Sequence, residues 1–235
     1  SLLKFPLLLI LVFPGLAASN DFDPIDYLQT IETIQGEFIQ RSIDRSSQML
    51  QESTGEVFIK KPNQLLWKMN NPNQKTVLIA KNTITYFDAD LEQVVISDYL
   101  EENQVSWVNI FLNNSAINST YRFKEKKLSN GETHISFDDV KGDYKAITFI
   151  FNSETVQGIN LLDNSANSIS IEFTRFEINQ MLSDNLFNFQ FPSSADVIDQ
   201  RNSVDVFRKT PYVLRQNPDF HPSGHVVLPQ YQAPG

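Results

Sequence analysis

Residues able to make or break covalent bonds are few and scattered in this sequence. His221 and His225 have the four-residue spacing of metal ligands on a helix, but Pro222 and Gly224 disfavour a helix there. His134 stands alone in a strand-like segment, and the chain has no cysteine. Serine-nucleophile, phosphate-loop and dinucleotide-binding motifs are also missing from the sequence. We therefore expect no metal, no cofactor and no enzymatic activity.

The chemistry that the sequence does favour is the burial of hydrocarbon. Apolar runs at 57–59 and 65–69 flank Lys60, Lys61 and the turn-forming pair Pro62-Asn63. Such runs predict paired strands with one apolar face. That face is either a dry core or a surface that binds something apolar, and periodicity alone does not separate the two.

The elements that would carry this face are mostly strands. We expect about eleven, bounded by turn residues. They lie near 37–44, 54–61, 64–69, 75–80, 83–88, 92–97, 119–126, 133–138, 146–151, 157–162 and 168–176. A long antiparallel meander tends to curl towards a barrel, which reduces its exposed edges.

Two short helices interrupt this pattern. Asp23-Pro24 predicts a helix start, and the helix is expected to end near Gln35-Gly36. Its apolar face would hold Ile25, Leu28, Ile31 and Ile34. A second helix is predicted within 103–115, with Val105, Val108, Phe111 and Leu112 at helical spacing. Two short helices cannot coat a large sheet, but they can cover its concave side.

The ends of the chain have a different composition. Lys4, the apolar segment 5–13 and the small residues at 17–19 predict a secretory signal peptide over 1–18, with an uncleaved anchor as the alternative. We expect one domain over 19–200. Residues 201–235 contain Pro211, Pro218 and further prolines with little periodicity, which predicts a disordered tail.

The expected domain is acidic. The whole chain has a formal net charge of −9, of which residues 1–18 contribute +1 and residues 201–235 contribute +2, which leaves −12 on residues 19–200. A surface of this sign repels nucleic acid and anionic membranes, so we expect neither as a direct partner.

An ordered series of motifs supports a more specific interpretation. It consists of QGEFIQ at 35–40, GEVFIKKPNQLLW at 55–67, Pro72, VLI at 77–79, TYFD at 85–88, DLEQV at 90–94, and a closing segment from Phe187 through Phe191-Pro192 to Asp199. This series resembles the periplasmic outer-membrane lipoprotein carrier family, LolA, from about Ile25 to Gln200. The resemblance implies a mainly β fold with short α-helices, an unclosed antiparallel β-barrel of about eleven strands under a helical lid.

The resemblance also implies a function. Members of this family ferry acylated lipoproteins across the periplasm, from an inner-membrane lipoprotein-releasing ABC transporter to an outer-membrane acceptor lipoprotein. We therefore expect a monomeric periplasmic carrier. An acceptor lipoprotein would need an acylated cysteine, which the chain lacks. A periplasmic sensor, or a carrier of another lipid, on the same fold remains the alternative.

Strand alternation and the resemblance together give the expected site. The cavity lining would be Val57, Ile59, Leu65, Trp67, Met69, Ile84, Tyr86, Phe149, Phe151, Ile171 and Phe173. The lid would contribute Leu28, Ile31, Ile34, Val105, Val108 and Phe111. The family commonly has arginine before the turn proline, as a latch to the lid. Here the residue is Lys61, which lacks arginine's planar fork, so Lys60 could share the role. Leu65 occupies a position that is often aromatic in the family, and the basic tail lies outside the common pattern.

Overall fold

The computed structural model describes residues 22–201 except 49, 100–106, 113–121 and 139–143. The predicted signal peptide, and all of the predicted tail after Arg201, lie outside this part of the chain. In chain order the described elements are α1 (Pro24–Thr30), β1 (Thr33–Ile43), β2 (Leu50–Lys60), β3 (Gln64–Asn71), β4 (Lys75–Ala80), β5 (Thr83–Asp88), β6 (Gln93–Asp98), α2 (Trp107–Leu112), β7 (Phe123–Lys127), β8 (Glu132–Asp138), β9 (Tyr144–Asn152), β10 (Thr155–Asp163), β11 (Ser168–Ile178), the 3₁₀ helix η2 (Asp184–Phe187) and β12 (Asp196–Asp199).

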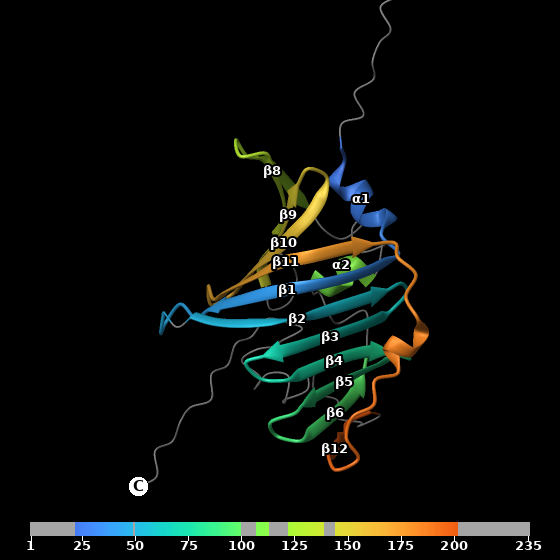
Figure 1. The fold of residues 1–235 in the computed structure, drawn as a ribbon. Coiled ribbons are helices and arrows are strands. Elements are labelled where there is room, and N and C mark those ends of the chain that lie inside the picture. Colours follow the sequence, from blue (N-terminus) through green and yellow to red (C-terminus); the bar gives the residue numbers. More distant parts are fainter. Residues whose placement is uncertain (1–21, 49, 100–106, 113–121, 139–143, 202–235) are drawn as a thin grey trace, which may run out of the picture.

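Twelve strands of the described chain form a single sheet (Figure 1). Its order is β12-β6-β5-β4-β3-β2-β1-β11-β10-β9-β8-β7. β12 runs parallel to β6, whereas the other neighbours pair antiparallel. Within this described sheet β7 and β12 are the two edges and do not pair with each other. The predicted fold, an unclosed and mainly antiparallel β-barrel with short helices, is confirmed.

The turns follow from local sequence. Lys81 and Asn82 join β4 to β5 with φ angles of 52° and 60°, the pattern of a two-residue hairpin turn that matches strand twist. Asn63, in the predicted Pro62-Asn63 turn between β2 and β3, also has a positive φ of 55°. At Asn63 and Asn82, asparagine tolerates the left-handed region better than most residues do.

The prediction for the first helix was partly wrong. α1 ends at Thr30, Ile31 is already extended, and Ile34 lies on β1, where it pairs with Ile59 on β2 and Ile178 on β11. The spacing of Leu28, Ile31 and Ile34 fits a helix, but β1 gains backbone hydrogen bonds on both sides by starting at Thr33. Tertiary pairing therefore overrides the local helical pattern.

The second helix lies within its predicted range, whereas the last strand was not predicted. α2 covers 107–112, in the middle of the predicted 103–115, and the remaining positions of that range lie outside the described residues. β12 was not predicted, because four residues without strong alternation carry little strand signal. In the described part of the chain, no helix is long and apolar enough to cross a membrane.

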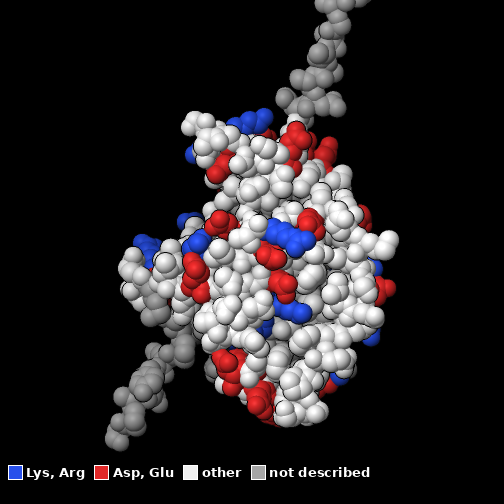
Figure 2. All heavy atoms as spheres, in the orientation of Figure 1, with Lys and Arg blue, Asp and Glu red and all other residues white. Residues whose placement is uncertain are grey.

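The sheet has two differently covered faces. α2 packs against β2 and belongs to the large apolar cluster on the inner face, together with Leu28 of α1 and Ile31, which directly follows it. On the outer face, the segment 179–195 runs from the end of β11 past β3 and β4 to β12 (Figure 1). Figure 2 shows this outer side, where acidic and basic side chains lie interspersed. We call segment 179–195 the strap.

Candidate lipid-binding interior

Strand alternation places the predicted lining residues on one face of the sheet. All eleven belong to the same inner cluster, and none is more than 8% exposed. Successive side chains of a strand point to opposite faces of the sheet. Leu65 accordingly lies in the inner cluster, whereas Leu66 lies in a second cluster on the outer face. The structure therefore brings the predicted set together, and the binding role of its members stays a prediction.

The lid residues divide into three outcomes. Four of them lie in the inner cluster and are at most 3% exposed: Leu28 on α1, Ile31 directly after it, and Val108 and Phe111 on α2. Ile34 lies in the same cluster but belongs to β1 rather than to a helix. Val105 lies outside the described residues.

Phe38 is an interior residue that sequence reasoning did not include. Its ring stacks on Trp67, with ring centroids 3.9 Å apart and planes 27° apart. Phe38 sits opposite Gly55, where an added Cβ would lie 2.7 Å from the Phe38 ring. The alternation of β1 was a signal that could have identified Phe38.

Further aromatic contacts extend the interior towards the far end of the sheet. Phe111 of α2 meets Phe149 of β9 edge to face, with ring centroids 5.3 Å apart. Phe149 also meets Phe137 of β8 at 6.0 Å. Sequence reasoning missed Phe137, although it lies two residues from Ile135 and therefore on the same buried face of the strand. Such rings supply large apolar area without directional hydrogen bonds.

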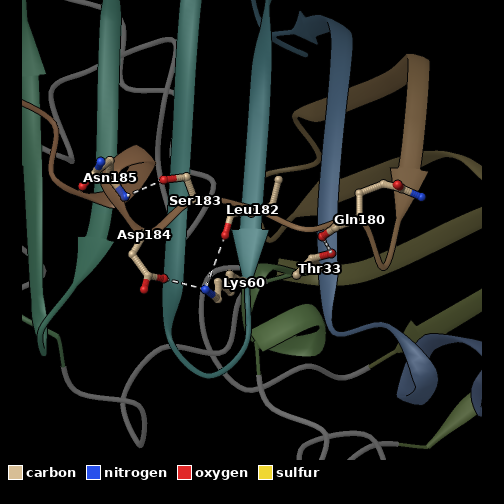
Figure 3. Close-up of polar contacts among 7 residues, drawn as sticks. All are labelled: Thr33, Lys60, Gln180, Leu182, Ser183, Asp184 and Asn185. Carbon is tan, nitrogen blue, oxygen red and sulfur yellow. Dashed lines mark hydrogen bonds and ion pairs between the residues drawn. The ribbon is translucent and has the colours of Figure 1, made fainter.

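The two predicted latch residues contact different parts of the molecule. The backbone N–H of Lys61 donates to the carbonyl oxygen of Glu32 at 2.9 Å, just beyond α1. Burial lowers the pKa of the half-buried Lys61, and the Glu32 carboxylate opposes that shift. Lys60 lies on the outer face, where its Nζ is 2.5 Å from Asp184 Oδ1 and 3.5 Å from the carbonyl oxygen of Leu182 (Figure 3). Lys61 is thus beside the lid helix and Lys60 beside the strap, while latching itself stays a prediction.

Asn179 links the end of α1 to the start of the strap. Its Nδ2 donates to the carbonyl oxygen of Thr30 at 3.1 Å, and its Oδ1 accepts from the backbone N–H of Glu32 at 2.7 Å. The Thr33 hydroxyl donates to the carbonyl oxygen of Gln180 at 2.7 Å (Figure 3). Sequence reasoning missed this junction because its partners are nearly 150 residues apart.

The strap covers apolar side chains on the outer face. Leu182 and Phe187 are buried there against Leu66 and Ala80. Ser183 caps η2 by accepting from the backbone N–H of Asn185 at 3.3 Å (Figure 3). The strap thus covers the apolar side chains that β3 and β4 present on the outer face, and the larger apolar cluster on the inner face is the candidate site.

The candidate site is mainly apolar. Its described side chains are mainly aliphatic and aromatic, and short helices cover them. Among the described residues, no group of three or more His, Cys, Asp or Glu side chains could hold a metal ion. The fold and the site define an open β-barrel protein with an apolar interior beneath short helices.

Comparison with known proteins gives the family. The chain belongs to the family described as outer membrane lipoprotein carrier protein LolA, whose family model matches residues 29–190. An outer-membrane lipoprotein carrier protein of Hahella chejuensis is 27% identical over 176 residues, covering 73% of this chain and 84% of that protein. One from Pseudomonas fluorescens strain Pf0-1 is 27% identical over 177 residues, covering 74% and 85%.

A solved structure of an uncharacterised conserved protein from Thermus thermophilus is also similar. It is 12% identical with a TM-score of 0.48, covering 75% of this chain and 97% of the other. At those values the likeness adds nothing to the sequence match.

Proposed function

We propose that this protein is a periplasmic carrier of acylated lipoproteins. It would receive them from an inner-membrane ABC transporter and deliver them to an outer-membrane acceptor. The observation that carries the proposal is the single apolar cluster that joins the inner face to both helices in a chain of the LolA family. The relatives named above are called lipoprotein carriers.

The physical need for such a carrier comes from the acyl chains. Each methylene group moved from water into an apolar environment gains about 0.8 kcal/mol. For three acyl chains of ordinary length, the free energy that holds a lipoprotein in its membrane is therefore on the order of 30 kcal/mol. Leucine, isoleucine and phenylalanine side chains can bind such chains without directional contacts.

Cargo would enter by replacing contacts that already exist. The predicted lining residues are buried, so acyl chains reach them only when the covering helices move. α1 has seven residues and α2 six, and helices this short are marginal in water by themselves. Their apolar contacts with the sheet are what acyl chains would substitute, which keeps net affinity low enough for release.

A pair of adjacent substitutions tests the proposal. Leu65 and Leu66 are 0% and 1% exposed but face opposite sides of β3. Leu65→Glu places a charge in the interior, whereas Leu66→Glu is the matched control beneath the strap. Lipoprotein release from spheroplasts is measured with each purified protein, after confirming that each is folded at the assay temperature.

The expected result is release by the parent protein and by Leu66→Glu, with about a tenfold loss for Leu65→Glu, since a buried charge is disfavoured beside acyl chains. Equal release by both variants would remove Leu65 from the site. Mass spectrometry of material co-purified without detergent adds a second outcome. Acylated lipoproteins support the proposal, and another lipid class alone contradicts it.

A further inference from the structure

The inner face changes character along its strands. In β1, the buried apolar residues Ile34 and Phe38 are followed on the same face by Gln40 and Ser42, each 5% exposed. In β2, Ser53 pairs with Gln40 and is also 5% exposed. On β1 and β2, the inner face next to their hairpin is therefore polar, while Ile169 and Ile171 of β11, which pair with Ser42 and Gln40, keep the neighbouring strand apolar.

The same change continues across β4 and β5. Met69 of β3 pairs with Lys75, and Lys75 pairs with Asp88, so all three side chains share the inner face. Lys75 Nζ lies 3.7 Å from Asp88 Oδ2, and these side chains are 7% and 9% exposed. The Tyr86 hydroxyl donates to Asp88 Oδ2 at 3.2 Å. We call Gln40, Ser42, Ser53, Lys75 and Asp88 the polar band.

Stability alone does not account for the polar band. Asp88 has a structural role, because its Oδ1 accepts from the backbone N–H groups of Asp90 and Leu91 in the turn after β5. That turn does not require a buried lysine on the neighbouring strand. Apolar side chains of similar volume often replace a buried ion pair without loss of stability. An interior that met only hydrocarbon would be served equally well by them.

We propose that the polar band binds the carbonyl oxygens at the head of the acyl chains while the tails lie along the apolar residues of the inner face. The ammonium group of Lys75, the serine hydroxyls and the Gln40 amide are donors suited to ester and amide carbonyls. Lys75 is balanced by Asp88, so the band is neutral in sum and suits uncharged carbonyls better than a phosphate group. This assignment rests on the proposed function and gives the cargo one orientation in the barrel.

Variants of the polar band test the assignment. Lys75→Met and Gln40→Met keep side-chain length and remove the donors. Lys68→Met, on the outer face of β3, is the matched control. Melting temperature is measured for each variant. Gln40→Met keeps the test decisive if Lys75→Met, which leaves Asp88 buried without this lysine, does not fold.

Three probes separate the recognised groups in fluorescence titrations of the full-length variants. A synthetic triacylated cysteinyl lipopeptide carries ester and amide carbonyls. Lysophosphatidylglycerol carries an ester and a phosphate. Hexadecylpyrene, delivered from cyclodextrin, carries neither. Because a hydrogen bond to a charged group contributes about a factor of ten in affinity, we expect a tenfold loss for Lys75→Met with the two ester probes and no loss with hexadecylpyrene.

The outcomes distinguish this assignment from the proposed function. Equal affinity of every variant for the lipopeptide, with normal binding otherwise, overturns the polar band and leaves the carrier function standing. Loss confined to lysophosphatidylglycerol makes phosphate the recognised group and also overturns the assignment. An equal loss for hexadecylpyrene does so too, because it indicates a general packing defect. If no probe binds the parent protein, both proposals fail.

Discussion

Gly55 marks the tightest point of the interior wall. A Cβ added there would lie 1.9 Å from the backbone carbonyl oxygen of Lys68 and 2.7 Å from the Phe38 ring. The first of these neighbours is backbone and cannot turn away. The close approach of β2 to β3 and the stacking of Phe38 on Trp67 therefore both depend on a residue without a side chain.

Gly55→Ala is expected to destabilise the protein by about 3 kcal/mol, because overpacking forces the strands apart. For a domain of this size that corresponds to roughly 6–12 °C in melting temperature, measurable by circular dichroism. Glu52→Ala, at an exposed position of the same strand, is the control. A Gly55→Ala protein that melts with the control would show that the close approach is not maintained in solution.

Asp44 supplies a pH dependence at the β1–β2 hairpin. Its Oδ1 accepts from the Ser46 hydroxyl at 2.6 Å and from the backbone N–H of Ser47 at 2.7 Å, and these bonds lower its pKa from 3.8 to about 2. A carboxyl group with a lowered pKa stabilises the folded loop at any pH above its unfolded-state pKa. This stabilisation is lost as the pH falls to its folded-state pKa. The loop should therefore loosen between about pH 4 and pH 2.

Carboxyl-carbon NMR of the hairpin measures this directly. The Asp44 resonance should titrate near pH 2, together with the amide of Ser47, and Asp44→Asn should abolish the shared transition. A midpoint at the ordinary aspartate pKa would contradict the hydrogen bonding described for this loop.

Among the larger elements, the strap is held mainly by packing. Leu182 is 6% exposed in the outer cluster, whereas its neighbour Met181 is 98% exposed. The ion pair between Lys60 of β2 and Asp184 of the strap is partly solvated, with side-chain exposures of 31% and 76%. Solvated pairs contribute little to stability, while buried leucines contribute much.

We therefore expect Leu182→Ala to lower the free energy of unfolding by about 2–4 kcal/mol and Met181→Ala to change it by less than about 0.5 kcal/mol. Asp184→Ala should fall between them, below about 1 kcal/mol. Urea denaturation measures all three. If Asp184→Ala destabilises more than Leu182→Ala, the ion pair rather than packing holds the strap.

All described secondary structure and both apolar clusters lie before residue 202. The sheet, both helices and both apolar clusters lie within residues 22–201. Deletion of 202–235 is therefore expected to leave the melting temperature within about 2 °C of the parent protein, measured by calorimetry. A fall of several degrees would show that the tail stabilises the fold.

For the whole molecule, the carrier proposal and the polar-band proposal describe the same binding interior. The barrel is open because β7 and β12 do not pair in the described sheet, and short helices cover its interior. The strap packs on the outer face and, through Asn179, hydrogen-bonds to the end of α1. Under the carrier proposal, the helices rather than the strands open the interior.

Local sequence determined most of the sheet and the inner set of residues. The alternation of Leu65, Trp67 and Met69 against Leu66 and Lys68 is a property of neighbouring residues, so it predicts a face wherever the strand lies. Turns such as Lys81-Asn82 are local in the same way. The order of motifs along the chain then indicated the family.

Tertiary structure decided what local patterns leave open. The end of α1 at Thr30 depends on strand partners and on Asn179, far away in the sequence. The parallel pairing of β12 with β6, and the alignment of Gln40 with Ser53 and of Lys75 with Asp88, depend on register between strands. Because register joins residues that the sequence separates, it can be read only from the folded molecule.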